Sequence, residues 1–221
     1  MGELFEEFNV FQAFGMTILL TVCAAVGSLV LGTLVAVLRV SPVGLFQKVG
    51  AFYVNTVRNT PLTLIIIACN IIFIVNLGLN ASSDIARNNI IWAIIGLSVY
   101  HAAFVCEALR SGVNTVPQGQ AEAARSIGLT FGQSMTDVLL PQAFRGAITP
   151  LGNTLIALTK NTTVATAIGV AEVSGLMREM IEFRPDLLLP IFLIVAIGFV
   201  ILTLPVGLLT TRLSSRLSVK R

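Results

Sequence analysis

The sequence has little charge. Only 11% of its 221 residues are Asp, Glu, Lys or Arg, while 55% are hydrophobic, and the mean hydropathy is +0.90. A soluble domain of this length carries roughly twice that charged fraction, because about 25% charged residues are typical of globular proteins. The scarcity of charge therefore excludes a water-soluble globular protein and predicts an integral membrane protein.

The chain also lacks the groups that metal binding and covalent catalysis need. Its single histidine, His101, lies in an apolar segment without neighbouring Cys, Asp or Glu ligands, whereas metal sites combine several such side chains. Neither a Gly-x-Ser-x-Gly nucleophile pattern nor a phosphate loop of the form GxxxxGK[ST] occurs. We expect no metal site, no catalytic residue and no ATP chemistry in this chain, and hence no enzyme.

Cysteine is also scarce, and its spacing carries no pairing signal. Cys23, Cys69 and Cys106 each stand alone in an apolar run, without a CxxC pair. Isolated cysteines in apolar runs are typical of small buried packing residues. We expect buried thiols rather than a disulfide or a redox site.

Five apolar stretches meet or approach the length of about 20 residues that a helix needs to cross a bilayer. They cover about residues 13–38, 60–79, 90–109, 151–173 and 187–211. Residues 43–61 before the second stretch could form a helix at the membrane interface or an early part of the span, and Pro61 favours a helix start. The sequence predicts one all-α transmembrane domain, residues 1–221, with five spans.

The distribution of lysine and arginine predicts the orientation. With the N-terminus outside, ten of these residues fall inside and three outside, and Lys160 lies within a span. The inside residues are Arg39, Lys48, Arg58, Arg110, Arg125, Arg145, Arg212, Arg216, Lys220 and Arg221, and the outside ones are Arg87, Arg178 and Arg184. The positive-inside rule therefore predicts N-terminus outside, C-terminus inside, and a cytoplasmic segment at about 111–149.

This cytoplasmic segment has the signals of two short helices. Pro117 can start the first helix and Gly128 can end it. Thr130 is a candidate N-cap of the second helix, which Pro141 should end or bend. The segment is predicted to project from the membrane as two helices joined by a tight turn.

Apolar side chains gather near that turn. Ile127, Leu129, Phe131 and Met135 would be exposed at the tip of the segment. Exposed apolar patches usually mark contact sites, which favours a docking surface. The alternative is a solvated loop that only connects two spans.

The residues of the segment resemble the EAA loop of permease subunits in ABC importers. The pattern is Glu-Ala-Ala, three residues, Gly, then Leu-Pro after a spacer, and it matches Glu122, Ala123, Ala124, Gly128, Leu140 and Pro141. Four further stretches are similar, in order, to permeases of polar amino-acid importers (the glutamate, glutamine and histidine family), most closely those for glutamate. They are VRNTPL at 57–62, VPQGQAEAA at 116–124, LPQAFRGAITPLGNTLIALTKNTT at 140–163 and GVAEV at 169–173.

This resemblance implies that the loop is the coupling helix, which sits in a groove of a separate cytoplasmic ATPase. The residues expected at that contact are Glu122, Ala123, Ala124, Ser126, Ile127, Gly128, Leu129 and Phe131. The alanines keep the helix slim, and Gly128 permits the backbone reversal. Glu122 could bond to the partner or to its own loop, or be an ordinary charge favoured by the helix dipole.

The predicted fourth span is the most polar. A lysine at a helix centre costs about 2.5–3.5 kcal/mol on insertion scales, so Lys160 should face a cavity, a neighbouring helix or the interface. The candidate substrate-pathway residues are Asn153, Thr154, Ala157, Lys160 and Asn161. The same polar face could instead join two subunits, and Lys160 could reach the cytoplasmic side.

Charged residues elsewhere have local predictions. Glu107 and Arg110, at i and i+3 near the inner end of the third span, are predicted to form an ion pair at the membrane boundary. Arg58 is predicted to anchor its span or to meet phospholipid headgroups. The outer stretch 175–186 could touch a substrate-binding protein or be a solvated loop.

Taken as a whole, the resemblance implies a type I ABC importer permease fold in the bacterial cytoplasmic membrane. The expected partners are an identical or similar permease subunit, an ATPase dimer that carries ATP and Mg, an extracellular substrate-binding protein and the lipid bilayer, but no nucleic acid. The expected cargo is a polar amino acid, with glutamate as the best guess, moved by alternating access. The alternative is an ATP-independent ion-coupled carrier or channel, which would need an acidic residue in mid-span, and none is present.

Overall fold

The computed structural model of the chain describes residue 4 and residues 7–217. Lys220 and Arg221, which entered the orientation argument, lie outside these residues. Throughout the described part the secondary structure is helical and contains no strand. The predicted all-α fold class is confirmed.

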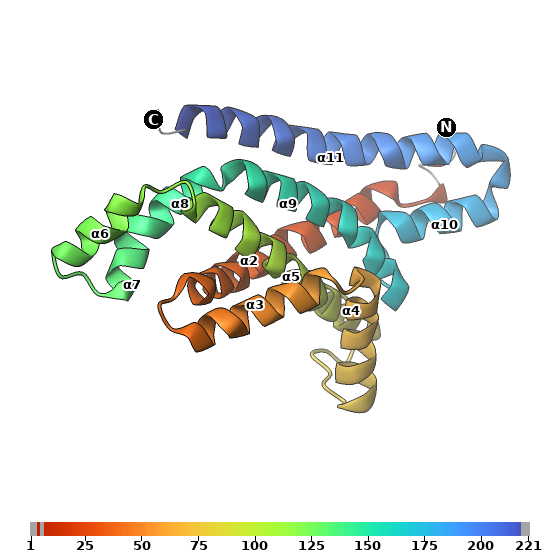
Figure 1. Cartoon of the computed structure of the whole chain (residues 1–221). Helices are drawn as coiled ribbons and strands as arrows, with labels where there is room; N and C mark the ends of the chain where they lie inside the picture. Colours follow the sequence, from red (N-terminus) through yellow and green to blue (C-terminus); the bar gives the residue numbers. More distant parts are fainter. Residues whose placement is uncertain (1–3, 5–6, 218–221) are drawn as a thin grey trace.

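Three long helices form the frame of the bundle: α2 (Val10–Val40), α5 (Ile85–Val113) and α11 (Leu188–Leu217). Helix α2 packs along α5 over much of its length, and α9 (Ile148–Asn161) lies between α11 and this pair (Figure 1). These long helices are mostly apolar, as expected of helices that cross the hydrocarbon core of a bilayer. They correspond to the predicted spans 13–38, 90–109 and 187–211, each extended by several residues.

Small residues allow the close packing of α2 on α5. A Cβ atom on Gly32 would lie 2.7 Å from the carbonyl oxygen of Ala102, and one on Gly27 would lie 2.4 Å from the hydroxyl of Ser98. Leu20, Ala24 and Leu97 are fully buried in the core between these helices. The backbones thus approach closely through glycine, as small residues permit in membrane helix pairs.

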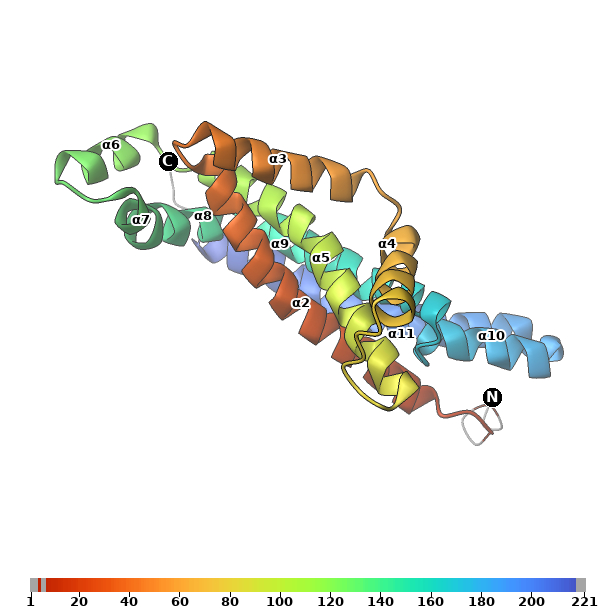
Figure 2. The same cartoon turned by 90° about the horizontal axis from the view of Figure 1, so that it is seen from below.

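The second predicted span, 60–79, starts at a break in the helix, and its helical part is residues 62–76. Helix α3 (Gly44–Arg58) packs beside α2 and α5, and the chain then breaks before α4 (Leu62–Cys69) and the π-helix η1 (Asn70–Asn76). Pro61 lacks an N–H donor and disfavours the helical conformation of the residue before it. The axis of α3 and that of the α4–η1 segment meet at an angle of 102° (Figure 2). Residues 43–61 thus contain a helix that lies along the bundle.

The predicted span 151–173 is not one helix. Helix α9 ends at Asn161 and continues as the 3₁₀ helix η3 (Thr162–Ile168), after which Gly169 adopts φ +79° and the chain turns. Val173 instead begins α10 (Val173–Phe183), because the Glu172 side chain caps that helix by accepting bonds from the backbone N–H groups of Ser174 and Gly175. The stretch 175–186 is therefore mostly α10 and the start of η4 (Pro185–Leu187), and not a loop.

By length and composition, three helical segments could cross a membrane: Val10–Val40, Ile85–Val113 and Pro185–Arg216. The bent pair of α3 with α4 and η1 would be a fourth if it is one span. Helix α9 has 14 residues, fewer than a full crossing needs without η3. The number of five spans stays a prediction.

The segment between α5 and α9 projects from one end of the bundle (Figures 1 and 2). It consists of α6 (Gln118–Ser126), α7 (Phe131–Gln133), the π-helix η2 (Ser134–Leu139) and α8 (Leu140–Gly146). Pro141, predicted to end or bend the second helix, does not end the helical run. It lies in the first turn of α8, where a missing N–H is tolerated.

The two ends of the bundle are distinct. The C-terminal end of α11 lies at the end from which α6 and α7 project, whereas the N-terminal end of α2 lies beside α10 at the other end (Figures 1 and 2). Which end faces the cytoplasm stays a prediction.

The close approach of α5 to α8 gives a test of the packing. A Cβ atom on Gly112 would lie 2.1 Å from the carbonyl oxygen of Ala143, a backbone atom that cannot move alone. We expect Gly112→Ala to destabilise the fold by about 1–3 kcal/mol, the usual range for overpacking, and to lower the melting temperature in detergent. Gly15→Ala is the control, since nothing lies within 4 Å of its added methyl group. Equal melting temperatures of the two variants would contradict the packing described.

Candidate functional site

The projecting segment turns sharply at Gly128. This residue has φ +82°, in the left-handed region that glycine adopts without strain. The N–H of Gly128 donates to the carbonyl of Arg125 (3.0 Å), and the N–H of Leu129 donates to the carbonyl of Ala124 (3.1 Å). These bonds satisfy the last carbonyls of α6, so the predicted turn at Gly128 is confirmed.

The second helix of the segment starts with a complete capping box. The Thr130 hydroxyl accepts a bond from the backbone N–H of Gln133 (3.3 Å), and the Gln133 side-chain oxygen accepts one from the N–H of Thr130 (3.0 Å). The reciprocal pair holds the first turn in place. The predicted N-cap at Thr130 is confirmed.

The tip exposes part of the predicted apolar set. Ile127 is 77% exposed and Phe131 is 39% exposed, while Leu129 is half-buried. The prediction of an exposed Met135 is wrong: its side chain is only 3% exposed, because α6 packs against η2 and covers it. Of the other predicted contact residues, Ala124 is buried, whereas Glu122, Ala123, Ser126 and Gly128 are exposed.

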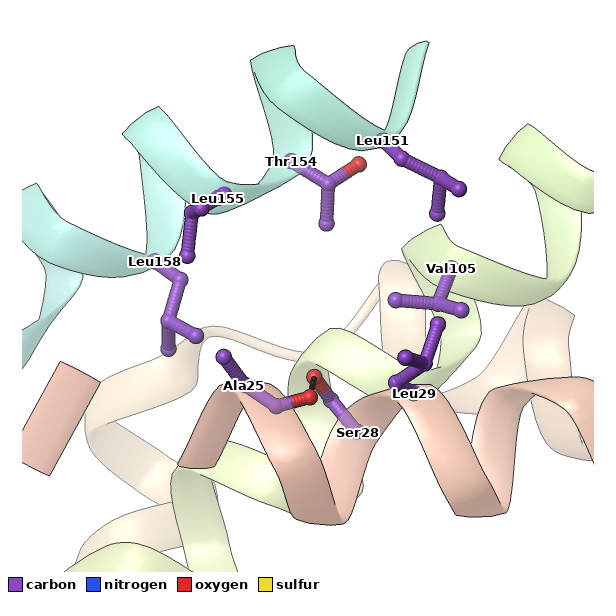
Figure 3. Close-up of a pocket in the computed structure, with 8 residues that line it drawn as sticks. All are labelled: Ala25, Ser28, Leu29, Val105, Leu151, Thr154, Leu155 and Leu158. Atoms are coloured by element: carbon purple, nitrogen blue, oxygen red, sulfur yellow. Dashed lines mark hydrogen bonds between the residues drawn. The ribbon is translucent and has the colours of Figure 1, made fainter. Parts of the chain in front are cut away.

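The five candidate pathway residues of α9 do not share one face. Asn153, Ala157 and Lys160 are exposed and follow one another at i, i+4 and i+7, which places them in one stripe. Thr154 points the other way, into a cavity of about 200 Å³ (Figure 3). The cavity is lined by Ala25, Ser28, Leu29, Val105, Leu151, Thr154, Leu155 and Leu158.

This cavity between α2, α5 and α9 is unsuited to a polar substrate. Its two hydroxyl groups are engaged within their own helices, since Thr154 donates to the carbonyl of Pro150 (3.0 Å) and Ser28 donates to that of Ala25 (3.0 Å). The remaining lining is aliphatic. Inside the bundle, then, Thr154 offers no unsatisfied group to a substrate.

Asn161, the fifth candidate, contacts a residue that the sequence analysis set aside. Its amide nitrogen lies 3.2 Å from Nε2 of His101, which is 1% exposed. An amide N–H donates here, so Nε2 accepts. The rings of Tyr100 and Phe104 flank His101 at centroid distances of 5.3 and 5.9 Å. The two bonded residues are 60 positions apart, and no local pattern pointed to their contact.

Three arginines surround the carboxylate of Glu107. Arg39 bonds to Oε1, and Nη1 of Arg58 lies 4.0 Å from the same oxygen. Nη2 of Arg110 lies 3.3 Å from Oε2, which confirms the predicted pair of Glu107 with Arg110. We call Arg39, Arg58, Glu107 and Arg110 the Glu107 cluster. It joins α2, α3 and α5 close to the end that bears the projecting helices.

The members of the Glu107 cluster differ in burial. The Arg39 side chain is 13% exposed and Glu107 is 25% exposed, while Arg58 and Arg110 are 44% and 43% exposed. The guanidinium carbon of Arg58 also lies 5.4 Å from the centroid of the Phe104 ring, in a cation–π arrangement. Arg58, predicted to meet phospholipid headgroups or to anchor its span, is thus directed toward α5.

The cysteines only partly follow the sequence prediction. Cys106 is buried and Cys69 is half-buried, but Cys23 is exposed on α2. Its predicted burial is wrong because no other helix among the described residues covers its face of α2. Within the described residues no group of three or more His, Cys, Asp or Glu side chains is placed to hold a metal ion.

Apolar helices with internal breaks and a rigid helical tip at one end of the bundle define an integral membrane transport subunit. Residues 8–219 match the binding-protein-dependent transport system inner membrane component, and the chain belongs to this family. The predicted class, a permease subunit of an ABC importer, and its location in the cytoplasmic membrane are confirmed.

Two proteins with similar sequences are amino-acid transport permeases. The glutamate transport system permease protein GluC of Corynebacterium efficiens is 50% identical over 218 residues, 96% of each chain. The probable glutamine ABC transporter permease protein GlnM of Bacillus subtilis is 34% identical over 217 residues, 97% of this chain and 96% of the relative.

Solved structures confirm the fold. An amino acid ABC transporter crystallised with histidines superposes with a TM-score of 0.76 at 25% identity, covering 94% of this chain and 93% of that one. The MetNI methionine ABC transporter in an inward-facing conformation gives a TM-score of 0.75 at 22% identity, covering 95% and 96%.

The Glu107 cluster can be tested by removing its one negative charge. We expect Glu107→Gln to destabilise the protein by about 3 kcal/mol, near the lower end of the range for a broken buried ion pair, because Arg39 is left buried without a counter-charge. Asp84→Asn is the matched control: Asp84 pairs with Arg87 at 3.7 Å, but both side chains are more than half exposed, so less than about 1 kcal/mol is expected. Thermal melts in detergent compare them, and equal losses would refute a structural role of the cluster.

Proposed function

We propose that this chain is the permease subunit of an ATP-driven importer for a polar amino acid, with glutamate as the cargo. The observation that carries the proposal is the 50% identity, over 96% of both chains, to a glutamate transport system permease. The match to a glutamine permease supports the wider substrate class of polar amino acids.

The tip of α6 and α7 is the proposed contact with a separate ATPase in the cytoplasm. Ile127 and Phe131 offer exposed apolar side chains on a turn that hydrogen bonds hold in one conformation. An apolar patch on a rigid support is suited to docking in a groove. ATP and Mg bind to that ATPase, whose dimer closes on ATP and moves the spans through this contact.

A second permease subunit, identical or similar, is proposed to cover the exposed stripe of α9. Asn153, Ala157 and Lys160 would face bare lipid in a single chain, and an uncovered lysine within a span is costly. The stripe could line the substrate path between the subunits or form their seam. The proposed spans are α2, α3 with α4 and η1, α5, α9 with η3, and α11, with the N-terminus outside.

An extracellular substrate-binding protein is proposed to dock at the opposite end, on α10. This helix buries Val173 and Met180 against the bundle and exposes Arg178, Glu179 and Glu182. Mixed exposed charges suit a partner that binds and leaves in each cycle, because such contacts guide association more than they add affinity. Alternating access between the two ends would then carry the cargo inward.

The function is tested by reconstitution in proteoliposomes with the ATPase and the glutamate-binding protein. We expect uptake of labelled glutamate only when ATP is present on the ATPase side. Gly128→Asp should abolish uptake while ATP hydrolysis continues, because a side chain at φ +82° strains the turn that presents Ile127. The control is Gly119→Asp in the first turn of α6, where nothing lies within 4 Å and acidic residues are favoured. Uptake without nucleotide would refute the ATP-driven function, and uptake by Gly128→Asp at the control's rate would refute the coupling role.

The stripe on α9 is tested by Lys160→Glu. We expect uptake to fall at least about tenfold, the effect of losing one interaction of a charged group. Size-exclusion chromatography of the complex separates the two roles of the stripe. An assembled but inactive complex places Lys160 on the pathway, loss of assembly places it at the subunit seam, and an active complex excludes both.

A further inference from the structure

Two interrupted helices end against the same turn of α5. Helix α3 ends at Arg58, whose guanidinium lies over the ring of Phe104. Helix α9 ends at Asn161, whose amide bonds to His101, one turn before Phe104 on α5. The sequence separates Arg58 from Asn161 by about 100 residues, yet α5 brings both helix ends to adjacent side chains.

Breaks of this kind mark binding sites in membrane proteins. Irregular backbone within a membrane is tolerated where it is buried in protein or lines a cavity, because its polar groups need partners. In many secondary transporters, substrates bind where discontinuous spans expose helix ends. The break at Asn59–Pro61 and the change from α9 to the 3₁₀ helix η3 are two such discontinuities.

The charges at this junction are unbalanced. Glu107 supplies one negative charge to three guanidinium groups, and Arg39 and Arg110 are both closer to it than Arg58 is, at 4.0 Å. Arg58 keeps 44% of its side chain exposed. Arg58 is the member of the Glu107 cluster that lies farthest from the shared carboxylate. A guanidinium carries several N–H donors and binds carboxylates in a two-pronged geometry, so Arg58 can bind a further anion.

We propose that Arg58 binds a carboxylate group of the transported amino acid at the junction of α3 with α5. The buried contact of His101 with Asn161 joins this part of α5 to the end of α9, the helix that carries the exposed stripe. This proposal rests on the proposed import of an amino acid and adds the residue that recognises its negative charge. Phe104 positions the guanidinium, and Glu107 limits its movement.

The test uses the whole complex of permease, ATPase and binding protein. We expect Arg58→Gln to reduce glutamate uptake about 10- to 100-fold, the effect of losing one charge-assisted hydrogen bond, and Arg58→Lys to recover part of it. Arg110→Gln is the matched control, because Arg110 pairs with the same carboxylate at the same exposure. It should transport within about threefold of the wild type. Equal losses in both glutamine variants would show that the ion pairs only support the structure and would overturn the proposal.

The change in melting temperature on adding a ligand tests binding at Arg58 separately from any folding defect of a variant. Millimolar glutamate should raise the melting temperature of the wild-type complex of permease and ATPase, measured in detergent without the binding protein, but not that of the Arg58→Gln complex. Arg58→Met, which keeps an apolar contact with the Phe104 ring, replaces that variant where it does not assemble. Glutamine, which lacks the side-chain carboxylate, and 4-aminobutyrate, which lacks the α-carboxylate, identify the group that Arg58 binds. If glutamate still raises the melting temperature of Arg58→Gln or Arg58→Met, the proposal is refuted.

Other outcomes show whether the anion bound by Arg58 is an amino-acid carboxylate or a lipid phosphate. A shift caused by phosphatidylglycerol and not by any amino acid, and lost in Arg58→Gln, would assign the site to a lipid phosphate and overturn the substrate role. A wild-type complex that takes up no amino acid would refute the proposed function itself. Normal glutamate uptake by Arg58→Gln would refute only the role of Arg58.

Discussion

The ion pairs of the Glu107 carboxylate are the interaction on which the arrangement of α2, α3 and α5 depends. A charge in apolar surroundings needs a counter-charge, and the single carboxylate of Glu107 is shared by arginines from α2, α3 and α5. The ends of three helices are thereby fixed relative to one another. Because α6 to α8 follow directly from α5, the projecting tip inherits its position from this cluster. In the proposed function, a movement imposed on the tip would reach helices that are already joined by ion pairs.

The helices fall into a compact pair and a set of interrupted ones. Helices α2 and α5 approach closely through glycine and share a buried core. In contrast, the α3–α4 and α9–η3 segments break where polar side chains meet α5. Continuous helices suit a frame that keeps its shape, whereas breaks let segments rotate about a few residues. The polar contacts of Arg58 and Asn161 lie where those two kinds of helix meet.

Local signals predicted local structure well. Apolar runs located the long helices, Gly128 and Thr130 located the turn and the cap, and the spacing of Glu107 and Arg110 predicted their pair, because each feature depends on neighbours within four residues. Two failures involve contacts that spacing does not reveal. Arg39 and Glu107 are 68 residues apart, and Met135 is covered by α6. Val173 is a local failure, since the Glu172 cap that starts its helix lies within three residues. The roles of the individual site residues depend on partner chains, which a single sequence does not describe.

The π-helix η2, between the tip and α8, has a geometric consequence. A π-turn contains one residue more than an α-turn, and each residue of an α-helix advances by about 100° around its axis. The extra residue therefore sets which way the apolar tip faces relative to the bundle. Removing it would replace the i→i+5 bonds of η2 by α-helical i→i+4 bonds and rotate Ile127 and Phe131 away from their present direction. The orientation of the exposed apolar tip is thus determined by the number of residues in η2, independently of the side chains that form the tip.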